Sequence, residues 1–577
     1  MPRLRSFDCA VFVCAFFLSF LNVRHCLPLR CFLFLALRML FRPLDAWPRS
    51  HYDVIDYYHT HYDEAVTSGE YQPFLYPWGM LGPLGVIVYL LIPHEKRPWL
   101  KKYRYLAFAW ITSFAIYTTA YTRARELVSA LVLGLLSAWS VIWFGAILIC
   151  NDAQTDFMRI ERTTGVFRSD SRLRGERSEV NGIADPKEKD TRDDAHADVV
   201  NGHGSPKDRH GEFAWQPYPL TPFIERLDWV LDLLCSFRGV GWNFQNSNIP
   251  PPPKHIQEQL RANSGAKVPK HSYKTHPGQM KLYTSRQELL KDNAWKVFKG
   301  YMILDALKTA MMYDPYFWGQ IDRAAPASSY LPHNPIFRNA YHFILSMLGV
   351  QYALQSVFAL GPLIFCGIPS PSLLGARAEI WSHPPTWGPY SVVLEKGLAG
   401  WWGNWWHQTF RFAFSEPSRK IIEALDMDKT SPAAKAVQLF VAFFLSGVVH
   451  ASGVYTCAGP TRPITGSMTF FLLQAVGIFA ETTLTQVARS AGLAQKIPSW
   501  LRKSWTFLYV HVWFYYTAHL LCDDFTRGGV WLFEPIPISL LRGMGLGADE
   551  RDGWWCWNPR FARWYSGDTW WNTGIAF

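Results

Sequence analysis

Residues 436–457 read AVQLFVAFFLSGVVHASGVYTC, an apolar stretch without a single Asp, Glu, Lys or Arg. At 1.5 Å of rise per residue, a helix of this length crosses the hydrocarbon core of a bilayer, which is about 30 Å thick. The stretch therefore predicts a membrane-spanning helix.

Apolar blocks of similar length recur along the 577 residues, of which 49% are hydrophobic. The mean hydropathy of −0.03 averages these blocks with long polar loops, so it does not indicate a soluble protein. We predict an all-α, polytopic transmembrane helical bundle of about 8–10 spans. The block at 339–366 exceeds one crossing, so it has to tilt, protrude or be split. The clearest predicted spans lie near 74–94, 104–121, 127–150, 295–312, 339–366, 436–457, 467–488 and 504–522.

These spans divide the chain into segments. Residues 1–73 form an N-terminal segment that could hold signal or anchor helices, and 74–150 contain the first transmembrane helices. Residues 151–215 are rich in charged residues, Gly and Ser, which predicts a disordered cytoplasmic insertion. The core follows at 216–525. The Trp-rich tail at 526–577 is expected at the membrane–water interface, where an apolar indole ring with one donor is favoured.

The net charge of +11 comes from Lys and Arg that lie between the apolar blocks. This distribution indicates a lipid bilayer rather than nucleic acid as the partner. The loops at 151–294 and 367–435 fall on the side with the larger basic excess, so both are predicted to face the cytosol. The ten Cys form no CxxC pair and no Cys/His cluster with zinc spacing, so we expect neither a disulfide framework nor a bound metal.

His450 lies inside the 436–457 run, about 21 Å from its start if the run is helical. A polar ring at that depth is costly unless it is paired or faces a wet cavity, so an intramembrane histidine is a candidate functional residue. The alternative is a neutral histidine that bonds a neighbouring helix. The sequence leaves both interpretations open.

A second polar group lies within an aromatic cluster, Trp401-Trp402-Gly403-Asn404-Trp405-Trp406-His407-Gln408. An interfacial aromatic belt would account for the Trp residues alone. Asn404, His407 and Gln408 bring three hydrogen-bonding side chains into the same cluster, which fits a polar pocket with aromatic walls better.

A third stretch, Arg238-Gly239-Val240-Gly241-Trp242-Asn243, precedes both. Together with Trp402–Gln408 and Ser446–His450, and in this order, it resembles the wax-synthase-like branch of the membrane-bound O-acyltransferase superfamily, as found in fungi. The resemblance extends over roughly residues 70–525, and the ordered set is far more specific than any one motif.

The resemblance implies a catalytic tunnel in the membrane, with His450 as the catalytic histidine and His407 at the second active-site position. It implies that four residues support the substrate or the oxyanion: Asn404, Gln408, Trp402 and Trp406. The chain departs from the branch at Asn404, where a charged residue is common, and at Ala451, where relatives often carry Glu. His450 must therefore be oriented by another group.

The implied reaction is transfer of an acyl group from acyl-CoA, with acetyl-CoA as the expected co-substrate, to a hydrophobic alcohol. His450 would remove the hydroxyl proton as the oxygen attacks the thioester, and His407 would stabilise the oxyanion. No bound cofactor or metal is needed. Arg238 and Asn243 are candidates for binding CoA, although Arg238 could equally be a helix-end arginine at the headgroup level. The expected location is the endoplasmic reticulum, with the entrance facing the cytosol.

The acceptor is left open. Acetylation of a terpenoid or polyketide in secondary metabolism is favoured by the resemblance, and a wax ester synthase that uses long-chain alcohols is the alternative. A polytopic transporter or lipid-binding membrane protein is the alternative from another class, although paired charges and related halves are not seen. A terpene cyclase would need several acidic groups, and Glu481 is the one that stands out in the spans. His59 and Asp63 match the His-x-x-x-Asp pattern of soluble acyltransferases, which we interpret as chance.

Overall fold

The computed structural model describes residues 48–163, 212–263, 279–321, 334–368, 371–492, 496–558 and 561–577. The chain divides into two compact units, which are treated separately below. The first unit comprises Met1–Ala153, Lys291–Gly361 and Thr386–Phe577. The second unit comprises Gln154–Leu290 and Pro362–Pro385. Residues 1–47, where signal or anchor helices are predicted, lie outside the described residues.

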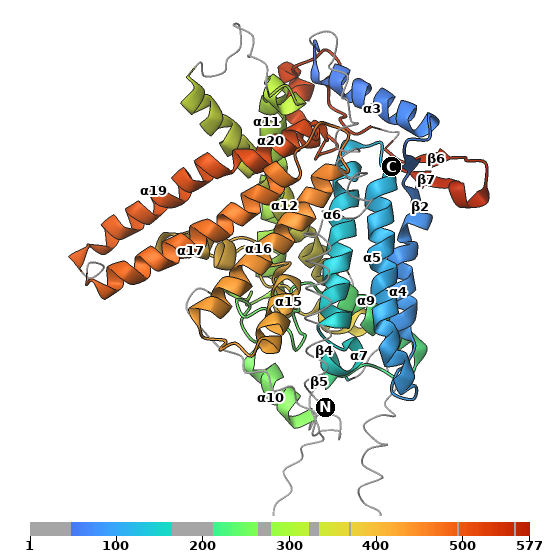
Figure 1. Ribbon diagram of the computed structural model, residues 1–577, viewed down its shortest axis with the longest axis vertical. Helices are drawn as coiled ribbons and strands as arrows, with labels where there is room; N and C mark the ends of the chain where they lie inside the picture. Colours follow the sequence, from blue (N-terminus) through green and yellow to red (C-terminus); the bar gives the residue numbers. More distant parts are fainter. Residues whose placement is uncertain are drawn as a thin grey trace, which may run out of the picture. The chain divides into compact units, whose positions relative to one another are not determined.

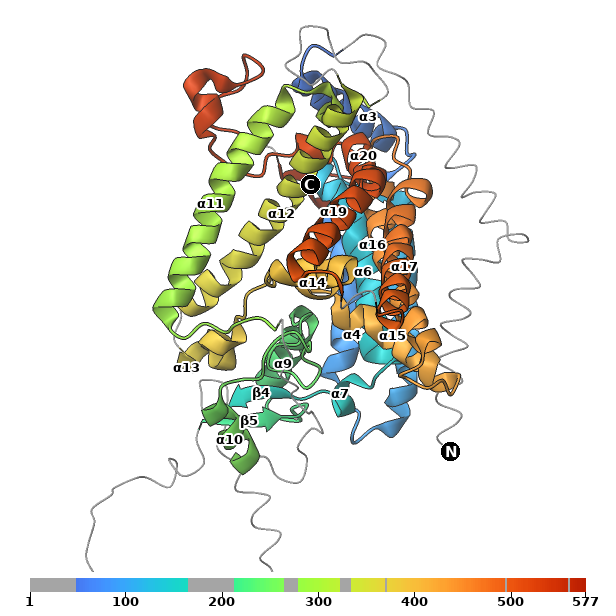
Figure 2. The same cartoon turned by 90° about the vertical axis from the view of Figure 1, so that its left-hand side faces the viewer.

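Helices dominate the first unit, and they follow the predicted spans closely (Figure 1). The helices at predicted spans are α4 (Leu81–Leu91), α5 (Arg104–Tyr121), α6 (Leu127–Phe144), α11 (Arg286–Met312), α12 (Pro335–Gly367), α16 (Pro432–Tyr455), α17 (Thr469–Ser490) and α19 (Ser499–Thr517). The sequence alone leaves open whether the 339–366 block tilts, protrudes or is split. Helix α12 is one continuous helix, so the block is not split. Figure 2 shows α12 beside the other long helix, α11.

Four helices among the described residues are long and apolar enough to cross a membrane. They are α6 with its π-helical extension η3 (Leu127–Ile149), α12, α16, and α17 with the preceding π-helical turn η9 (Ile464–Ser490). The remaining helices are shorter or more polar, so the larger predicted number of spans stays a prediction. The chain is an integral membrane protein with a helical fold.

Helix α16 is held against α6 by a close backbone approach. A Cβ on Gly134 of α6 would lie 2.0 Å from the carbonyl oxygen of Ser452 in α16, so only glycine fits there. At the same contact, the Thr456 hydroxyl donates to the Ala130 carbonyl (2.7 Å) and accepts from the Gly134 amide (3.1 Å). These contacts determine where α16 lies in the unit.

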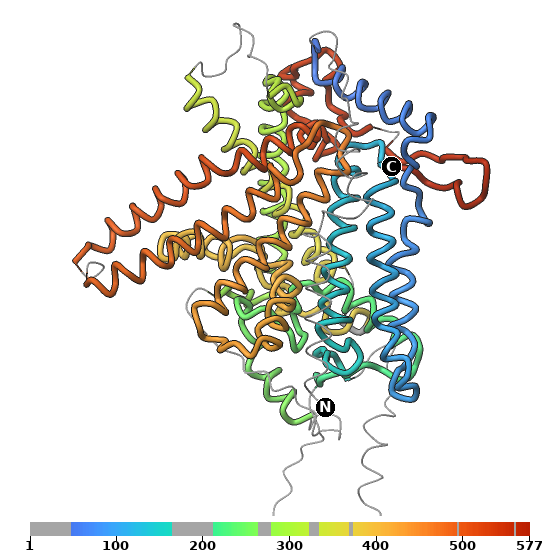
Figure 3. Tube along the Cα trace, viewed as in Figure 1, coloured from blue at the N-terminus to red at the C-terminus, as the bar shows by residue number. Residues whose placement is uncertain are grey.

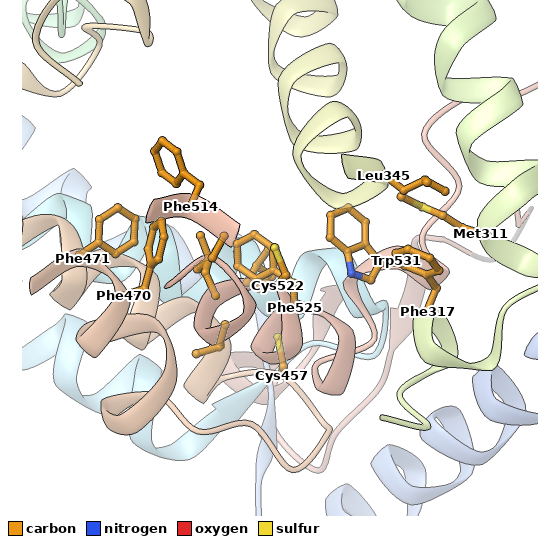
Figure 4. Packing of buried hydrophobic residues seen from close by; sticks show 14 of the residues in the cluster. Met311, Phe317, Leu345, Cys457, Phe470, Phe471, Phe514, Cys522, Phe525 and Trp531 are labelled. Carbon is orange, nitrogen blue, oxygen red and sulfur yellow. The ribbon is translucent and has the colours of Figure 1, made fainter. Parts of the chain in front are cut away.

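The core of the first unit is aromatic (Figure 4). Phe470 and Phe471 of α17 and Phe514 of α19 lie at one end, and Trp531 and Phe317 lie at the other. All five are less than a tenth exposed. Rings of this size contribute most of the apolar area that is removed from water or lipid when the helices associate.

One feature of the first unit differs from the prediction. Residues 504–522, predicted as one span, form the end of α19 and the start of a separate helix, α20 (His519–Arg527). The buried carboxylate of Asp524 in α20 accepts hydrogen bonds from the Arg462 and Ser467 amides, so α20 is held by polar contacts with a distant part of the chain. The polar stretch before the first span is also helical, as α3 (His51–Thr67) with a Ser50/Asp53 capping box.

The C-terminal tail returns to the start of the described chain, as the tube in Figure 3 shows. Strand β7 (Gly574–Ala576) pairs with β2 (Leu75–Tyr76) and β6 (Arg563–Tyr565) in a three-stranded antiparallel sheet. The tail indoles are about half exposed or more: Trp554, Trp555, Trp557, Trp564, Trp570 and Trp571. Such exposure is compatible with the predicted interfacial location, which stays a prediction.

The second unit contains β4 (Arg159–Arg162) paired antiparallel with β5 (Phe213–Gln216), together with α9 (Phe223–Cys235) and α10 (Lys254–Asn263). Strand β4 and all but the last residue of β5 lie within 151–215, so the predicted disorder is wrong for these ends, and residues 164–211 lie outside the described residues. Composition misled here because Arg159 is fully buried among Asp228, Asp232 and Glu161. Charged residues that pair in this way can be part of a packed core.

Candidate active site

His450 lies on α16 with its two ring nitrogens in different surroundings. Nδ1 is 2.9 Å from the carbonyl oxygen of Ser446, one turn earlier. A carbonyl only accepts hydrogen bonds, so Nδ1 must carry the hydrogen, and the neutral ring then keeps its lone pair on Nε2. The ring packs against Phe471 of α17, with centroids 4.3 Å apart. The Ser446 carbonyl therefore fixes the orientation of the His450 ring, although the next residue, Ala451, has no carboxylate.

The glycine of the Ser446–His450 motif has a packing reason. A Cβ on Gly447 would lie 2.5 Å from Sδ of Met468, in the turn η9 (Ile464–Met468) that precedes α17. Helix α16 starts in a defined place because Ser431 caps it, accepting a hydrogen bond from the Ala434 amide. The N-cap therefore fixes where α16 begins, and the contact at Gly447 brings the motif close to the start of α17.

The second motif forms a π-helical turn, η8 (Trp401–Trp405), after helix α14 (Ser391–Gly400). Gln408 closes this turn, because its Nε2 donates to the carbonyls of Trp402 (2.9 Å) and Trp406 (2.6 Å). Its Oε1 accepts from Arg411 (3.1 Å). Both amide hydrogens of Gln408 are thus engaged by the backbone, so its contacts favour a positioning role over the predicted contact with the oxyanion.

Trp402 connects the two motifs. Its Nε1 donates to Oε1 of Gln474 on α17 (3.4 Å), and its ring lies 6.0 Å from that of Phe471. Phe471 is also the ring against which His450 packs. The Trp402 segment and His450 therefore share one neighbour, although 48 positions separate them in the sequence.

His407 follows the π-helical turn and is surrounded by aromatic rings. Its neighbours are Trp406, Phe410, Phe358 and Trp387, with ring centroids 5.3–6.0 Å away. These rings present edges and faces that limit the rotation of the imidazole. The other two residues of this motif that were predicted to support the substrate or the oxyanion are Asn404 and Trp406. The Asn404 side chain is buried, and that of Trp406 is half-buried.

Arg411, Phe471 and Gln474 were not predicted as part of this site. Arg411 donates to the Gly403 carbonyl (2.9 Å) as well as to Gln408, so it holds the turn from the following helix, α15 (Arg411–Ala424). Gln474 is fully buried in α17. A lone glutamine in an apolar span is a sequence signal that could have identified it, since intramembrane polar groups need partners.

The first motif lies in the second unit and has structural contacts there. Arg238 donates to the carbonyls of Pro384 (3.0 Å) and Pro385 (2.7 Å), and burial lowers its pKa to about 10. Asn243 donates to the Asp156 carbonyl (2.7 Å) and accepts from the Met158 amide (3.2 Å). Both side chains are thus hydrogen-bonded to backbone groups of the same unit. These hydrogen bonds do not support the predicted contact with CoA, which stays a prediction.

The His59/Asp63 pattern also has structural contacts. His59 is buried on α3 with Nε2 3.7 Å from Glu126, and burial lowers its pKa to about 4. Asp63 accepts a hydrogen bond from Arg563 of the tail (2.9 Å). An apolar hollow of about 440 Å³ lies elsewhere in the unit, between Trp78, Trp564 and Trp570, and includes none of the predicted site residues.

The fold and these contacts define a polytopic helical membrane protein with a histidine on a spanning helix and a second one beside an aromatic turn. Residues 383–473, which contain both histidines, match the sequence profile described as "Membrane bound O-acyl transferase family". The similarity to that family covers this segment of the chain.

Three fungal proteins illustrate the similarity. Acetyltransferase ple2 of Rhodocybe pseudopiperita is 25% identical over 298 residues, which are 51% of this chain and 65% of the relative. O-Mevalon transferase yanI of Aspergillus niger is 24% identical over 306 residues, 48% of this chain and 58% of the relative. Acetyltransferase eriL of Hericium erinaceus is 25% identical over 329 residues, 56% of this chain and 72% of the relative. The chain thus spans about three fifths of the length of the first two. No solved structure shows a significant match.

Proposed function

We propose that this protein transfers an acyl group from acyl-CoA to the hydroxyl of an apolar alcohol. The observation that carries the proposal is the environment of His450, whose Nδ1 is held by the Ser446 carbonyl and whose Nε2 is left as the basic nitrogen. The family profile covers this residue and His407. The names of the relatives favour acetyl-CoA as the donor, and a terpenoid or polyketide alcohol is the proposed acceptor.

In the proposed reaction, Nε2 of His450 accepts the proton of the substrate hydroxyl while the oxygen attacks the thioester carbonyl. The carbonyl oxygen becomes an oxyanion as the C–O bond forms. The C–S bond then breaks, the carbonyl is restored, and His450 returns the proton to the departing CoA thiolate. The products are the ester and CoA, and the histidine is regenerated neutral.

His407 is the proposed donor to the oxyanion, with Asn404 as a second candidate. A fixed donor is worth about 2.7–4 kcal/mol in such a site, because it does not have to reorganise as charge develops. The aromatic rings around His407 support this role, since they restrict the orientation of the imidazole. Gln408 and Trp402 are assigned to holding the turn.

Acyl-CoA is charged and cytosolic, so the proposed entrance faces the cytosol, in the endoplasmic reticulum membrane. The basic loops at 151–294 and 367–435 support this orientation, as does the continuity of α12 between them. Glycosylation acceptor sites inserted in either loop should stay unmodified, while the same site inserted at 313–338 should be glycosylated. Modification in 367–435 would refute the orientation.

The activity is tested with microsomes that contain the protein or its His450→Ala variant. They are supplied with labelled acetyl-CoA or palmitoyl-CoA and with a panel of terpenoid, polyketide and fatty alcohols. Labelled ester that depends on His450 and on acetyl-CoA supports the proposal. Ester from palmitoyl-CoA and fatty alcohols alone would indicate a wax ester synthase, and absence of ester from every pair would contradict acyl transfer.

A further inference from the structure

Helix α14 is broken just before the aromatic turn of the site. Gly397 has φ +60° and ψ −136°, outside the helical region, and the chain becomes helical again immediately afterwards. The first amides after such a break have no carbonyl of their own helix to bond. Leu398 is fully buried, and a buried amide without an acceptor costs roughly 1–3 kcal/mol, so another group has to satisfy it.

Glu481 of α17 supplies the missing acceptor. Its Oε2 accepts hydrogen bonds from the amides of Leu398 (2.9 Å) and Ala399 (3.4 Å). Negative charge is favourable at the start of a helical segment, where the amides point outward. A Cβ on Gly397 would lie 1.5 Å from Oε1 of Glu481, so glycine is needed there both for the positive φ and for the approach of the carboxylate.

The capped segment leads directly into the site. Gly400 is followed by the π-helical turn with Trp402, which donates to Gln474, also on α17. Gln474 and Glu481 are seven residues apart, about two helical turns, and so lie on one face of α17. This face holds the segment at two points, one before the turn and one within it.

We infer that Glu481 is a positioning residue for the acyl transfer proposed above, on which this inference rests: it caps the helical segment that places Trp402 and His407. The carboxylate that stood out in the sequence as a candidate acid therefore acts through the backbone of α14. A shift of this segment by about 1 Å would misplace the oxyanion donor, and misplacements of that size lower turnover by up to roughly a hundredfold.

The test compares two replacements of similar size, Glu481→Gln and Glu481→Met, in the full-length protein purified in detergent. The Gln amide keeps an oxygen that can accept the Leu398 and Ala399 amides, whereas the Met side chain lacks one. Met also suits an apolar span, so both variants should insert. The matched control is the same pair of replacements at Glu395, which is 57% exposed on α14 and 3.8 Å from Lys503.

Turnover per folded protein should fall at least about tenfold in Glu481→Met, with a smaller change in the KM for acyl-CoA, and stay within about threefold of wild type in Glu481→Gln. Both Glu395 variants should match wild type. A Met variant with normal kcat would overturn the inference. Equal loss in Gln and Met would also overturn it, because an acceptor oxygen at this position would then not be sufficient to hold the segment.

Amide hydrogen exchange of the 393–406 peptide gives a readout that does not depend on activity. Exchange at Leu398 and Ala399 should be faster in Glu481→Met than in wild type and Glu481→Gln, because their acceptor is lost. Unchanged exchange would overturn the inference even if no alcohol were acylated. Faster exchange in Glu481→Met, together with a wild-type protein that transfers no acyl group, would refute the proposed function and leave the capping role intact.

Discussion

Replacement of His450 by alanine should abolish acyl transfer and leave the fold intact. A general base that takes its proton through a fixed nitrogen contributes about 10²–10⁴ to the rate, equivalent to roughly 2.7–5.5 kcal/mol of barrier. In the structure, that nitrogen is Nε2, because the Ser446 carbonyl holds the hydrogen on Nδ1. We therefore expect kcat to fall by at least about a hundredfold.

The cost to stability should be much smaller. His450→Ala removes one intrahelical hydrogen bond, worth about 1 kcal/mol, and the contact with Phe471. The helix itself keeps its Ser431 cap and its close contact with α6 at Gly134. Alanine also favours the helix more than histidine does. Membrane insertion and the amount of protein should thus be close to wild type.

The assay measures labelled ester per inserted protein in microsomes with saturating acetyl-CoA. The matched control is His511→Ala on α19, because His511 makes the same bond to a carbonyl one turn earlier, that of Phe507 (2.8 Å). The control should keep its activity within about threefold. Wild-type turnover in correctly inserted His450→Ala would refute the assignment of the base, and equal loss in both variants would indicate a general helix defect.

Three further predictions concern other parts of the chain. His407→Ala should lower turnover by roughly two orders of magnitude, and His407→Asn should restore part of it; equal inactivity of the two would argue against a hydrogen-bond donor. His59→Ala should leave turnover per folded protein unchanged, since the ring is buried on α3 and contacts none of the proposed site residues in the structure; a loss at normal protein level would restore the soluble-type motif as a candidate. Deletion of residues 165–210 should change kcat by less than about tenfold, because the segment lacks the apolar residues for a core; a larger drop would show that it contributes to catalysis.

The positions of the long helices could be predicted from the sequence because their cause is local. A helix bonds its own backbone, and an uninterrupted apolar run is sufficient to favour it in a membrane. The prediction for 104–121 has the same bounds as α5, and that for 436–457 differs from α16 by a few residues. The separate helix α20 was missed because the contacts that hold it, such as the hydrogen bonds from the Arg462 and Ser467 amides to Asp524, join residues that are distant in sequence.

The identity of the histidines could also be read from the sequence, since His450 is a polar ring in an apolar run and His407 follows a Trp cluster. Their surroundings could not. Phe471 joins the two motifs, Gln408 closes the turn, and Glu481 caps the segment before it. The contacts of Phe471 and Glu481 depend on how α17 packs, and the contact of Gln408 depends on how the loop after α14 folds. Neither can be predicted from the local sequence. By itself, therefore, the sequence determined the class of protein and the candidate residues. The tertiary structure decided what surrounds them, such as Phe471 between the two motifs and the Glu481 carboxylate at Leu398, because these contacts depend on distances between separate helices.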